Sequence, residues 1–204
     1  MRAEALNGPG EPERVRWTLD IVSARANLPG LRVLDLACRI GSFSAAFAAR
    51  GAEVLGLDGR QENLDEVPPC SAKFARADVR ELRASRQGEW DVTLCLGILY
   101  HLEAVDALAL MRTMRDLTGK FAVIDTHVGT NYGEVVIDGQ KYRGSVYGEA
   151  LGHPWSALDN PTSWWFTEVS LEQALKDSGW INVEWIPGRS WPGESDDRRW
   201  LVVT

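Results

Sequence analysis

Short apolar runs alternate along the chain with segments in which apolar residues recur every three or four positions. The runs predict buried strands, and the periodic segments predict amphipathic helices. The expected strands are 31–36, 53–58, 72–77, 91–97, 120–125, 181–186 and 199–204, and the expected helices are 11–27, 42–50, 60–67, 104–117 and 167–178. Because the two kinds of segment alternate, we expect one doubly wound, mostly parallel α/β domain over residues 1–204, with 1–30 as a helical lead.

Residues 131–166 break this alternation, because they are rich in glycine, tyrosine and tryptophan. Asp138-Gly139 predicts the turn of a hairpin within this insertion. We expect the insertion to form an aromatic lid over one edge of the sheet. Neighbouring side chains in an extended segment point to opposite sides, so of Trp164 and Trp165 one ring is expected in the core and the other in a pocket. The alternative is that both rings only pack the lid on the domain.

Composition and charge narrow the classes of protein. The chain has 29 Asp and Glu against 22 Lys and Arg, a net charge of −7. An acidic surface repels phosphate backbones, so a nucleic-acid partner is unfavourable. The sequence has neither an apolar run of membrane-spanning length nor a signal peptide, which predicts a cytoplasmic protein. Its three cysteines form no CxxC pair, so neither a disulfide framework nor a zinc site is indicated.

A turn of small residues, 37–41, follows the first buried strand and precedes a helix. This geometry directs free backbone N–H groups and a helix N-terminus at a polar ligand. Asp58 ends the next strand about 20 residues further on, where nucleotide-binding units place a ribose-binding carboxylate. Gly41 is the only glycine of the turn, so the Gly-x-Gly-x-x-Gly fingerprint of nicotinamide enzymes is absent.

Four pieces of sequence, in order, resemble the motifs of class I S-adenosylmethionine (SAM)-dependent methyltransferases. They are residues 33–41, 56–60, 77–79 and 96–102. The last piece, together with 163–167, resembles the subgroup related to wobble-uridine tRNA-modifying transferases, many of whose members act on small molecules. The resemblance implies a seven-stranded Rossmann-like sheet whose last strand is antiparallel, and it implies SAM as the cofactor.

The same resemblance implies roles for individual residues. Asp58 would accept hydrogen bonds from the ribose hydroxyls, and Asp78 one from the adenine amino group, since carboxylates are pure acceptors. The turn, together with Leu96 and Gly97, would lie against the methionine part. The expected cofactor-binding residues are Asp35, Ala37, Arg39, Gly41, Asp58, Gly59, Arg60, Asp78, Val79, Leu96 and Gly97, and the expected substrate-binding residues are Tyr100, Tyr132, Trp164 and Trp165.

Arg39 departs from the family pattern, which commonly has glycine there and at Ala37. Arginine adopts a positive φ only at a cost, so either the turn is relaxed or Arg39 has a task. One hypothesis is that its guanidinium binds the SAM carboxylate or an anionic substrate. The alternative is that its side chain points into solvent.

Methyl transfer to a hydroxyl requires an aligned acceptor and benefits from a base. His101 and His127 follow predicted central strands, at the edge where ligands bind in this architecture. His101 is the first candidate for the base and His127 the second; the alternative for His101 is a structural bond to a loop carbonyl. Asp125 and His127 together suggest a cation site, but two ligands are thin evidence, and we expect no metal.

Together, these expectations predict SAM-dependent methylation of a small-molecule acceptor at an oxygen atom, and specialised metabolism is one process in which the enzyme could act. Two alternatives stay open: a tRNA-modifying methyltransferase, and a SAM-binding partner protein that has lost its chemistry. The sequence leaves the acceptor and the oligomeric state open, a homodimer included.

Overall fold

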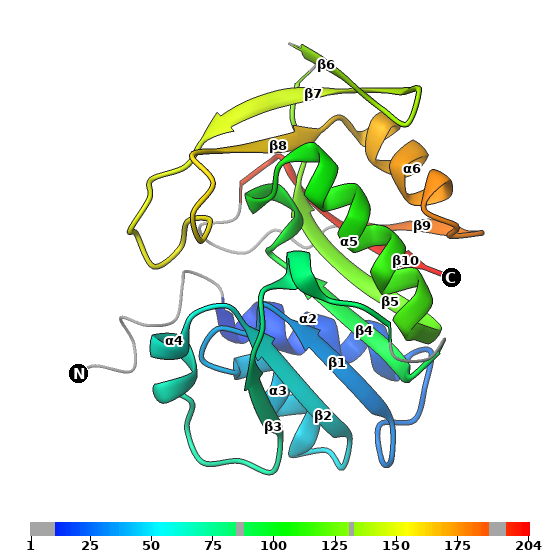
Figure 1. Cartoon of the computed structure of the whole chain (residues 1–204). Coiled ribbons are helices and arrows are strands. Elements are labelled where there is room, and N and C mark those ends of the chain that lie inside the picture. Colours follow the sequence, from blue (N-terminus) through cyan, green and yellow to red (C-terminus); the bar gives the residue numbers. More distant parts are fainter. Residues whose placement is uncertain (1–10, 85–87, 131–132, 188–194) are drawn as a thin grey trace.

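The computed structural model describes residues 11–84, 88–130, 133–187 and 195–204, and it contains two sheets (Figure 1). The strands of the larger sheet are β1 (Arg32–Leu36), β2 (Glu53–Asp58), β3 (Lys73–Arg76), β4 (Trp90–Leu96), β5 (Thr118–His127), β9 (Val183–Ile186) and β10 (Arg198–Val203). Their order is β3-β2-β1-β4-β5-β10-β9. Strands β1 to β5 are parallel, and β10 runs antiparallel to both of its neighbours. The expected seven-stranded α/β fold is therefore confirmed.

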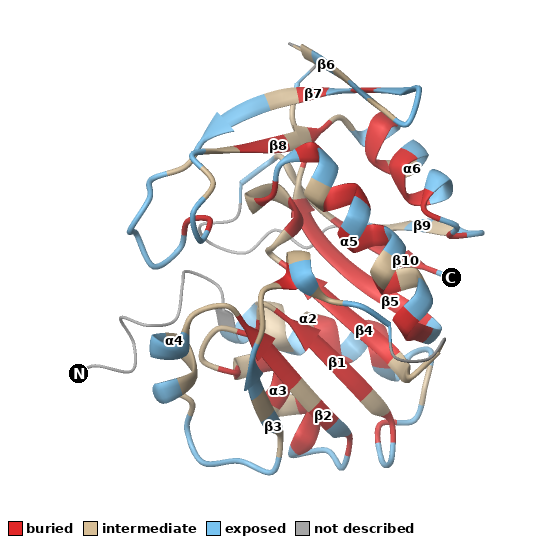
Figure 2. Cartoon of the chain, viewed as in Figure 1, coloured by how far each residue is buried: buried red, intermediate tan, exposed pale blue. Residues whose placement is uncertain are grey.

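Helices cover both faces of this sheet, so its central strands are buried on both sides (Figure 2). The α-helices are α2 (Glu11–Ser23), α3 (Ser42–Ala48), α4 (Gln61–Asp65), α5 (Ala104–Leu117) and α6 (Glu168–Asp177), and the short 3-10 helices are η1 (Val79–Glu81) and η2 (Leu99–His101). The buried residues form two hydrophobic cores, and successive residues of β1 belong to different ones. Val33 packs with α2 and α3, whereas Leu34 packs with α5 and α6. The 104–117 segment is helical as expected. Helix α3 ends two residues before the expected 50, and α2 ends four residues before the expected 27.

The capping of α6 follows the sequence, but one of its expected core residues does not. Thr167 is the N-cap and accepts a hydrogen bond from the Ser170 N–H. Gly179, just past the helix, has φ 92°, the left-handed conformation that favours glycine. Val169 was expected in the apolar stripe with Leu171, and this is wrong: Val169 is 82% exposed and Leu171 is 1% exposed. The helix rotates its buried stripe away from Val169 to meet α5 and the second sheet.

The second sheet is antiparallel and is built from the insertion. Its strands, in order, are β6 (Gly133–Ile137), β7 (Gln140–Gly148) and β8 (Thr162–Phe166). Asp138 and Gly139 form the predicted turn, with φ 52° and 80°. The sequence did not predict β8. Tyr142, Trp164 and Phe166 join the core of α5 and α6, so much of the insertion's aromatic content is structural. A lid role for 131–166 as a whole stays a prediction.

No helix in the described ranges is both long and apolar enough to cross a lipid bilayer.

Candidate active site

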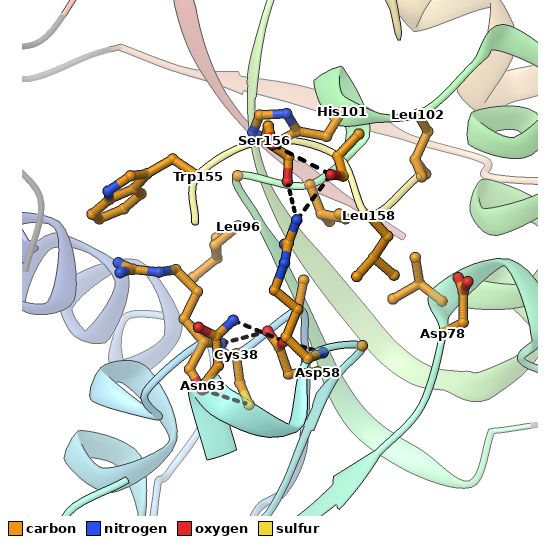
Figure 3. A pocket seen from close by; sticks show the side chains of 18 of the residues that line it. Cys38, Asp58, Asn63, Asp78, Leu96, His101, Leu102, Trp155, Ser156 and Leu158 are labelled. Carbon is orange, nitrogen blue, oxygen red and sulfur yellow. Dashed lines mark hydrogen bonds between the residues drawn. The ribbon is translucent and has the colours of Figure 1, made fainter. Parts of the chain in front are cut away.

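A pocket opens at the carboxyl ends of β1, β2 and β4 (Figure 3). It holds about 980 Å³ of space, open solvent at its mouth included. Most of the residues that we expected at the site line this pocket: Asp35, Ala37, Arg39, Asp58, Gly59, Arg60, Asp78, Val79, Leu96, Gly97, Tyr100 and His101. The parallel topology brings these distant pieces of sequence to one edge.

The turn after β1 passes through the left-handed region of backbone conformation. Ala37 has φ 55° and Arg39 has φ 51°, so the turn is not relaxed at the arginine. Gly41 also has a positive φ, 74°, but it is not among the residues that line the pocket. A Cβ at Gly41 would lie 2.7 Å from the Phe74 ring. The glycine is therefore required by packing against β3, and its contact with the cofactor stays a prediction.

Asp58, at the end of β2, is 4% exposed and organises the turns around it. One carboxylate oxygen accepts from the Arg60 N–H and from the Asn63 amide, both at 2.9 Å, and the other accepts from the Arg39 N–H at 2.9 Å. A carboxylate has about four acceptor positions, so one remains for a ligand hydroxyl. Asp58 thus has a structural role, and its binding of the ribose hydroxyls stays a prediction.

Asp78, after β3, is held by Arg80. The guanidinium of Arg80 donates to both carboxylate oxygens, with Nη2 to Oδ2 at 2.5 Å, and the Arg80 N–H also bonds Oδ1. The hydrogen bonds from Arg80 lower the pKa of Asp78, although burial opposes them. The Asp78 carboxylate is therefore largely engaged within the protein. Contact with an adenine amino group would require sharing it with Arg80.

The guanidinium of Arg39 lies on the ring of Trp155, with its Cζ 3.4 Å from the ring centroid. This contact is a cation–π stack, which favours arginine over lysine because the guanidinium is planar. Arg39 thus has a partner inside the protein, and the alternative in which it only points into solvent is wrong. Whether it also reaches the SAM carboxylate stays a prediction.

His101, in η2, meets a buried acid. Its Nδ1 lies 3.0 Å from Oε1 of Glu149, whose side chain is 1% exposed. Burial lowers the pKa of His101, and the Glu149 charge only partly offsets it. The imidazole is therefore neutral at pH 7, and a neutral imidazole can accept a proton. Since the carboxylate can only accept at Nδ1, that nitrogen carries the hydrogen and Nε2 keeps its lone pair.

His127, the second candidate base, does not line this pocket. Its Nδ1 bonds Asp197 at 2.8 Å, and its ring packs 4.4 Å from Tyr100 and 5.0 Å from Trp165, centroid to centroid. Tyr147 also stacks on Trp165, at 4.6 Å. Trp165 is not among the residues that line the pocket, and its contact with a substrate stays a prediction.

Two further substrate-contact expectations have different outcomes. Trp164 is 5% exposed and belongs to the core, as expected for one member of the pair, but it does not line the pocket. A substrate role for Trp164 therefore finds no support, because α5 and the second sheet enclose its ring. Tyr132 lies outside the described residues.

Asp125, at the end of β5, is fully buried and binds two arginines. Arg198 donates two hydrogen bonds of 2.6 and 2.7 Å to its carboxylate, and Arg14 of α2 donates one of 2.5 Å. Burial raises the pKa of Asp125, but the two guanidinium groups outweigh burial and lower it. With its oxygens committed to two cations, Asp125 does not fit a shared metal site with His127. Within the ranges the structure describes, no three His, Cys, Asp or Glu side chains gather as metal ligands.

Several residues that line the pocket were not predicted from the sequence. They are Arg14, Asn63, Arg80, Ser156, Ala157, Leu158 and Asn160. Glu149, which holds His101, was missed as well. The residues from 154 to 160 belong to the insertion that we expected to be a lid, so the signal for them was its aromatic composition. No local pattern indicates Arg14 or Glu149, because their partners lie 111 and 48 residues away.

Comparison with known proteins agrees with this geometry. A family model described as a methyltransferase domain matches residues 12–184. The chain belongs to this methyltransferase family. A ubiquinone biosynthesis O-methyltransferase from Hahella chejuensis is 34% identical over 90 residues, which cover 41% of this chain and 38% of the relative. The O-antigen chain terminator bifunctional methyltransferase/kinase WbdD of Escherichia coli is 33% identical over 100 residues, 43% of this chain and 14% of the relative. The chain thus spans less than half the length of these relatives.

Among solved structures, the N-terminal domain of EvdMO1 with S-adenosylhomocysteine (SAH), in the presence of D-fucose, superposes with a TM-score of 0.73. It is 26% identical, and the match covers 94% of this chain and 80% of that one. The methyltransferase domain is therefore SAM-dependent, and SAM is its cofactor. The pocket fits that cofactor, because Asp58 offers a free acceptor position and Gly97, with φ 86°, allows the backbone to approach closely.

Proposed function

We propose that this methyltransferase domain transfers a methyl group to a hydroxyl oxygen of a small-molecule acceptor, with His101 as the general base. SAM, when bound, supplies an electrophilic methyl group on a positively charged sulfur. Nε2 of His101 takes the hydroxyl proton as the acceptor oxygen attacks. Asp58, Leu96 and Gly97 hold the donor, and the walls of the pocket exclude water.

One observation carries this proposal: the imidazole of His101 lines the pocket while a buried carboxylate contacts its Nδ1. A base held by an orienting acid is a recurring arrangement for activating hydroxyls. Nε2 makes no hydrogen bond with any described residue, so it is available to an acceptor. The names of the relatives support oxygen as the target, since one is an O-methyltransferase, and D-fucose offers hydroxyls in the structural neighbour.

Replacing His101 with alanine is expected to lower kcat about 10²-fold, the lower end of what general-base catalysis contributes. Binding of SAH should change little, because the cofactor is held mainly by the turns after β1 and β2. The measurement is methyl transfer to a panel of phenols, sugars and quinols, together with calorimetry of SAH binding. His127→Ala is the matched control and should retain most of the activity.

The pH profile gives a second test. Since burial lowers the pKa of His101, its neutral form persists below the ordinary histidine value of about 6.5. For the wild type, kcat/KM should therefore rise with pH through a midpoint below that value and then level off. A fully active His101→Ala variant, or a profile without an acidic limb, would overturn the role of His101.

A tRNA-modifying methyltransferase is the second candidate function. It rests on the resemblance of 96–102 and 163–167 to that subgroup. The net charge of −7 argues against it, because a tRNA partner requires a basic surface. A salt-sensitive tRNA gel shift would favour it over the small-molecule acceptor.

A further inference from the structure

Three arginines, one after each of β1, β2 and β3, bind a single segment of the insertion. We name this segment, residues 149–160, the strap. Arg39 stacks on Trp155, and Arg60 donates to the carbonyls of Ser156 and Ala157 at 3.0 and 2.8 Å. Figure 3 places Trp155, Ser156 and Leu158 around the pocket.

The third arginine, Arg80, donates to Asp159 at 2.7 Å while it holds Asp78. Between these polar contacts, Leu158 packs directly on Gly59: a Cβ built at Gly59 would lie 2.5 Å from Leu158 Cδ1. The turns after β1, β2 and β3, three of the four expected to bind the cofactor, are therefore attached to the strap. Residues 154–158 and 160 of the strap line the pocket.

The strap also holds the base. The Ala157 N–H donates to Oε2 of Glu149 at 3.0 Å, and the same carboxylate meets Nδ1 of His101. The Asn160 amide donates to the carbonyl of His101 at 2.9 Å. The strap thus contacts both groups through the same few residues: Ala157 accepts a hydrogen bond from Arg60 and donates one to Glu149, which contacts His101.

We propose that Glu149 is the positioning residue of His101 and that docking of the strap on Arg39, Arg60 and Arg80 holds Glu149 in place. This inference rests on the proposed role of His101 as the base. The Glu149 carboxylate fixes the tautomer with hydrogen on Nδ1, so Nε2 faces the acceptor with its lone pair. Because the arginines come from the cofactor-binding turns, the strap joins the arrangement of the cofactor site to the orientation of the base.

The test is nitrogen NMR of the imidazole rings, which needs no acceptor. The chain has three histidines, so single His variants assign the signals. In the wild type, Nε2 of His101 should show the shift of a pyridine-type nitrogen. The other groups that act on His101 are Arg60 and His127, which lower its pKa, whereas Glu149 raises it.

Glu149→Ala should lose the fixed tautomer, and the titration midpoint of His101 should move down, because the negative charge is gone. Glu149→Gln keeps an acceptor for Nδ1, so it should move the midpoint down while retaining the tautomer. This split separates positioning from a merely structural role. Asp197→Asn is the control and should change only His127. An unaltered His101 tautomer in folded Glu149→Ala would overturn the role of Glu149.

The strap is tested separately through Asp159. Asp159→Ala removes the strap partner of Arg80 and leaves the bond between Arg80 and Asp78. We expect the His101 signals to broaden toward the Glu149→Ala pattern, and Trp155→Ala should act in the same direction. Asp138→Ala is the matched control, since Asp138 is 64% exposed and paired with Arg112, and Asp159 is 68% exposed.

The outcomes distinguish the two proposals. Unchanged His101 signals in both Asp159→Ala and Trp155→Ala would overturn the role of the strap. Retained methyl transfer in His101→Ala would overturn the proposed function. The NMR result that Glu149 fixes the tautomer of His101 would remain valid in that case.

Discussion

Replacing Asp125 with alanine is expected to lower the free energy of unfolding by about 4 kcal/mol, because it leaves two arginine charges in the interior without their partner. Asp125 is 0% exposed, and the side chains of Arg14 and Arg198 are each 13% exposed, so water replaces the lost carboxylate only in part. The contact between Arg14 and Asp125 also ties α2 to β5 across 111 residues. Urea unfolding, monitored by circular dichroism, measures the loss.

Asp138→Ala is the matched control for this prediction. It removes an ion pair whose members are 45% and 64% exposed, and exposed pairs contribute about 0–1 kcal/mol. An Asp125→Ala variant no less stable than Asp138→Ala would contradict the prediction. The pH dependence has a definite sign: the folded-state pKa of Asp125 is lowered, so its stabilisation is present above about 3.9, the unfolded value, and is lost as the pH falls through the folded value.

Replacing Asp58 with alanine is expected to weaken SAH binding about 10³-fold, or about 4 kcal/mol. Two losses combine. The ligand loses a charged acceptor, and the backbone N–H groups of Arg39 and Arg60 lose the oxygen atoms that orient their turns. Each unmet hydrogen bond of this kind costs about 1–3 kcal/mol. Calorimetry with SAH measures the affinity directly.

Asp58→Asn separates the two losses, because the amide keeps one acceptor oxygen and the shape of the side chain. We expect a smaller loss of affinity than in the alanine variant. Asp20→Ala, on the exposed side of α2, is the control and should bind SAH as the wild type does. Wild-type affinity in a folded Asp58→Ala variant would mean that the cofactor lies elsewhere.

Local patterns predicted much of the scaffold. The strand 53–58 and the helix 104–117 have the expected bounds, the turn at Asp138-Gly139 has the expected conformation, and Thr167 caps α6. These features depend on interactions within a few residues, which sequence periodicity and capping residues report. Val169 shows the limit of this reasoning. Periodicity predicts which residues share one face of a helix, but it does not predict how far the neighbouring elements extend over that face.

The site residues that lie at strand ends were predictable from the sequence, whereas those that depend on contacts between distant segments were not. Asp58, Gly97 and His101 follow predicted strands, and a parallel sheet brings such ends together. Trp165 was expected in the pocket, but it stacks with Tyr147 and His127 and does not line the pocket. Two residues adjacent in a strand point to opposite sides, and the sequence does not contain the identity of what packs on either side.

The sequence alone determined that this chain folds into a doubly wound sheet with a carboxylate at the end of its second strand, because hydrophobic periodicity and turn chemistry act over short distances. Only the tertiary structure decided the partners of the charged groups: Glu149 with His101, Arg14 and Arg198 with Asp125, and three arginines with one strap. Charges select partners by proximity in space, and proximity across many tens of residues exists only once the chain has folded.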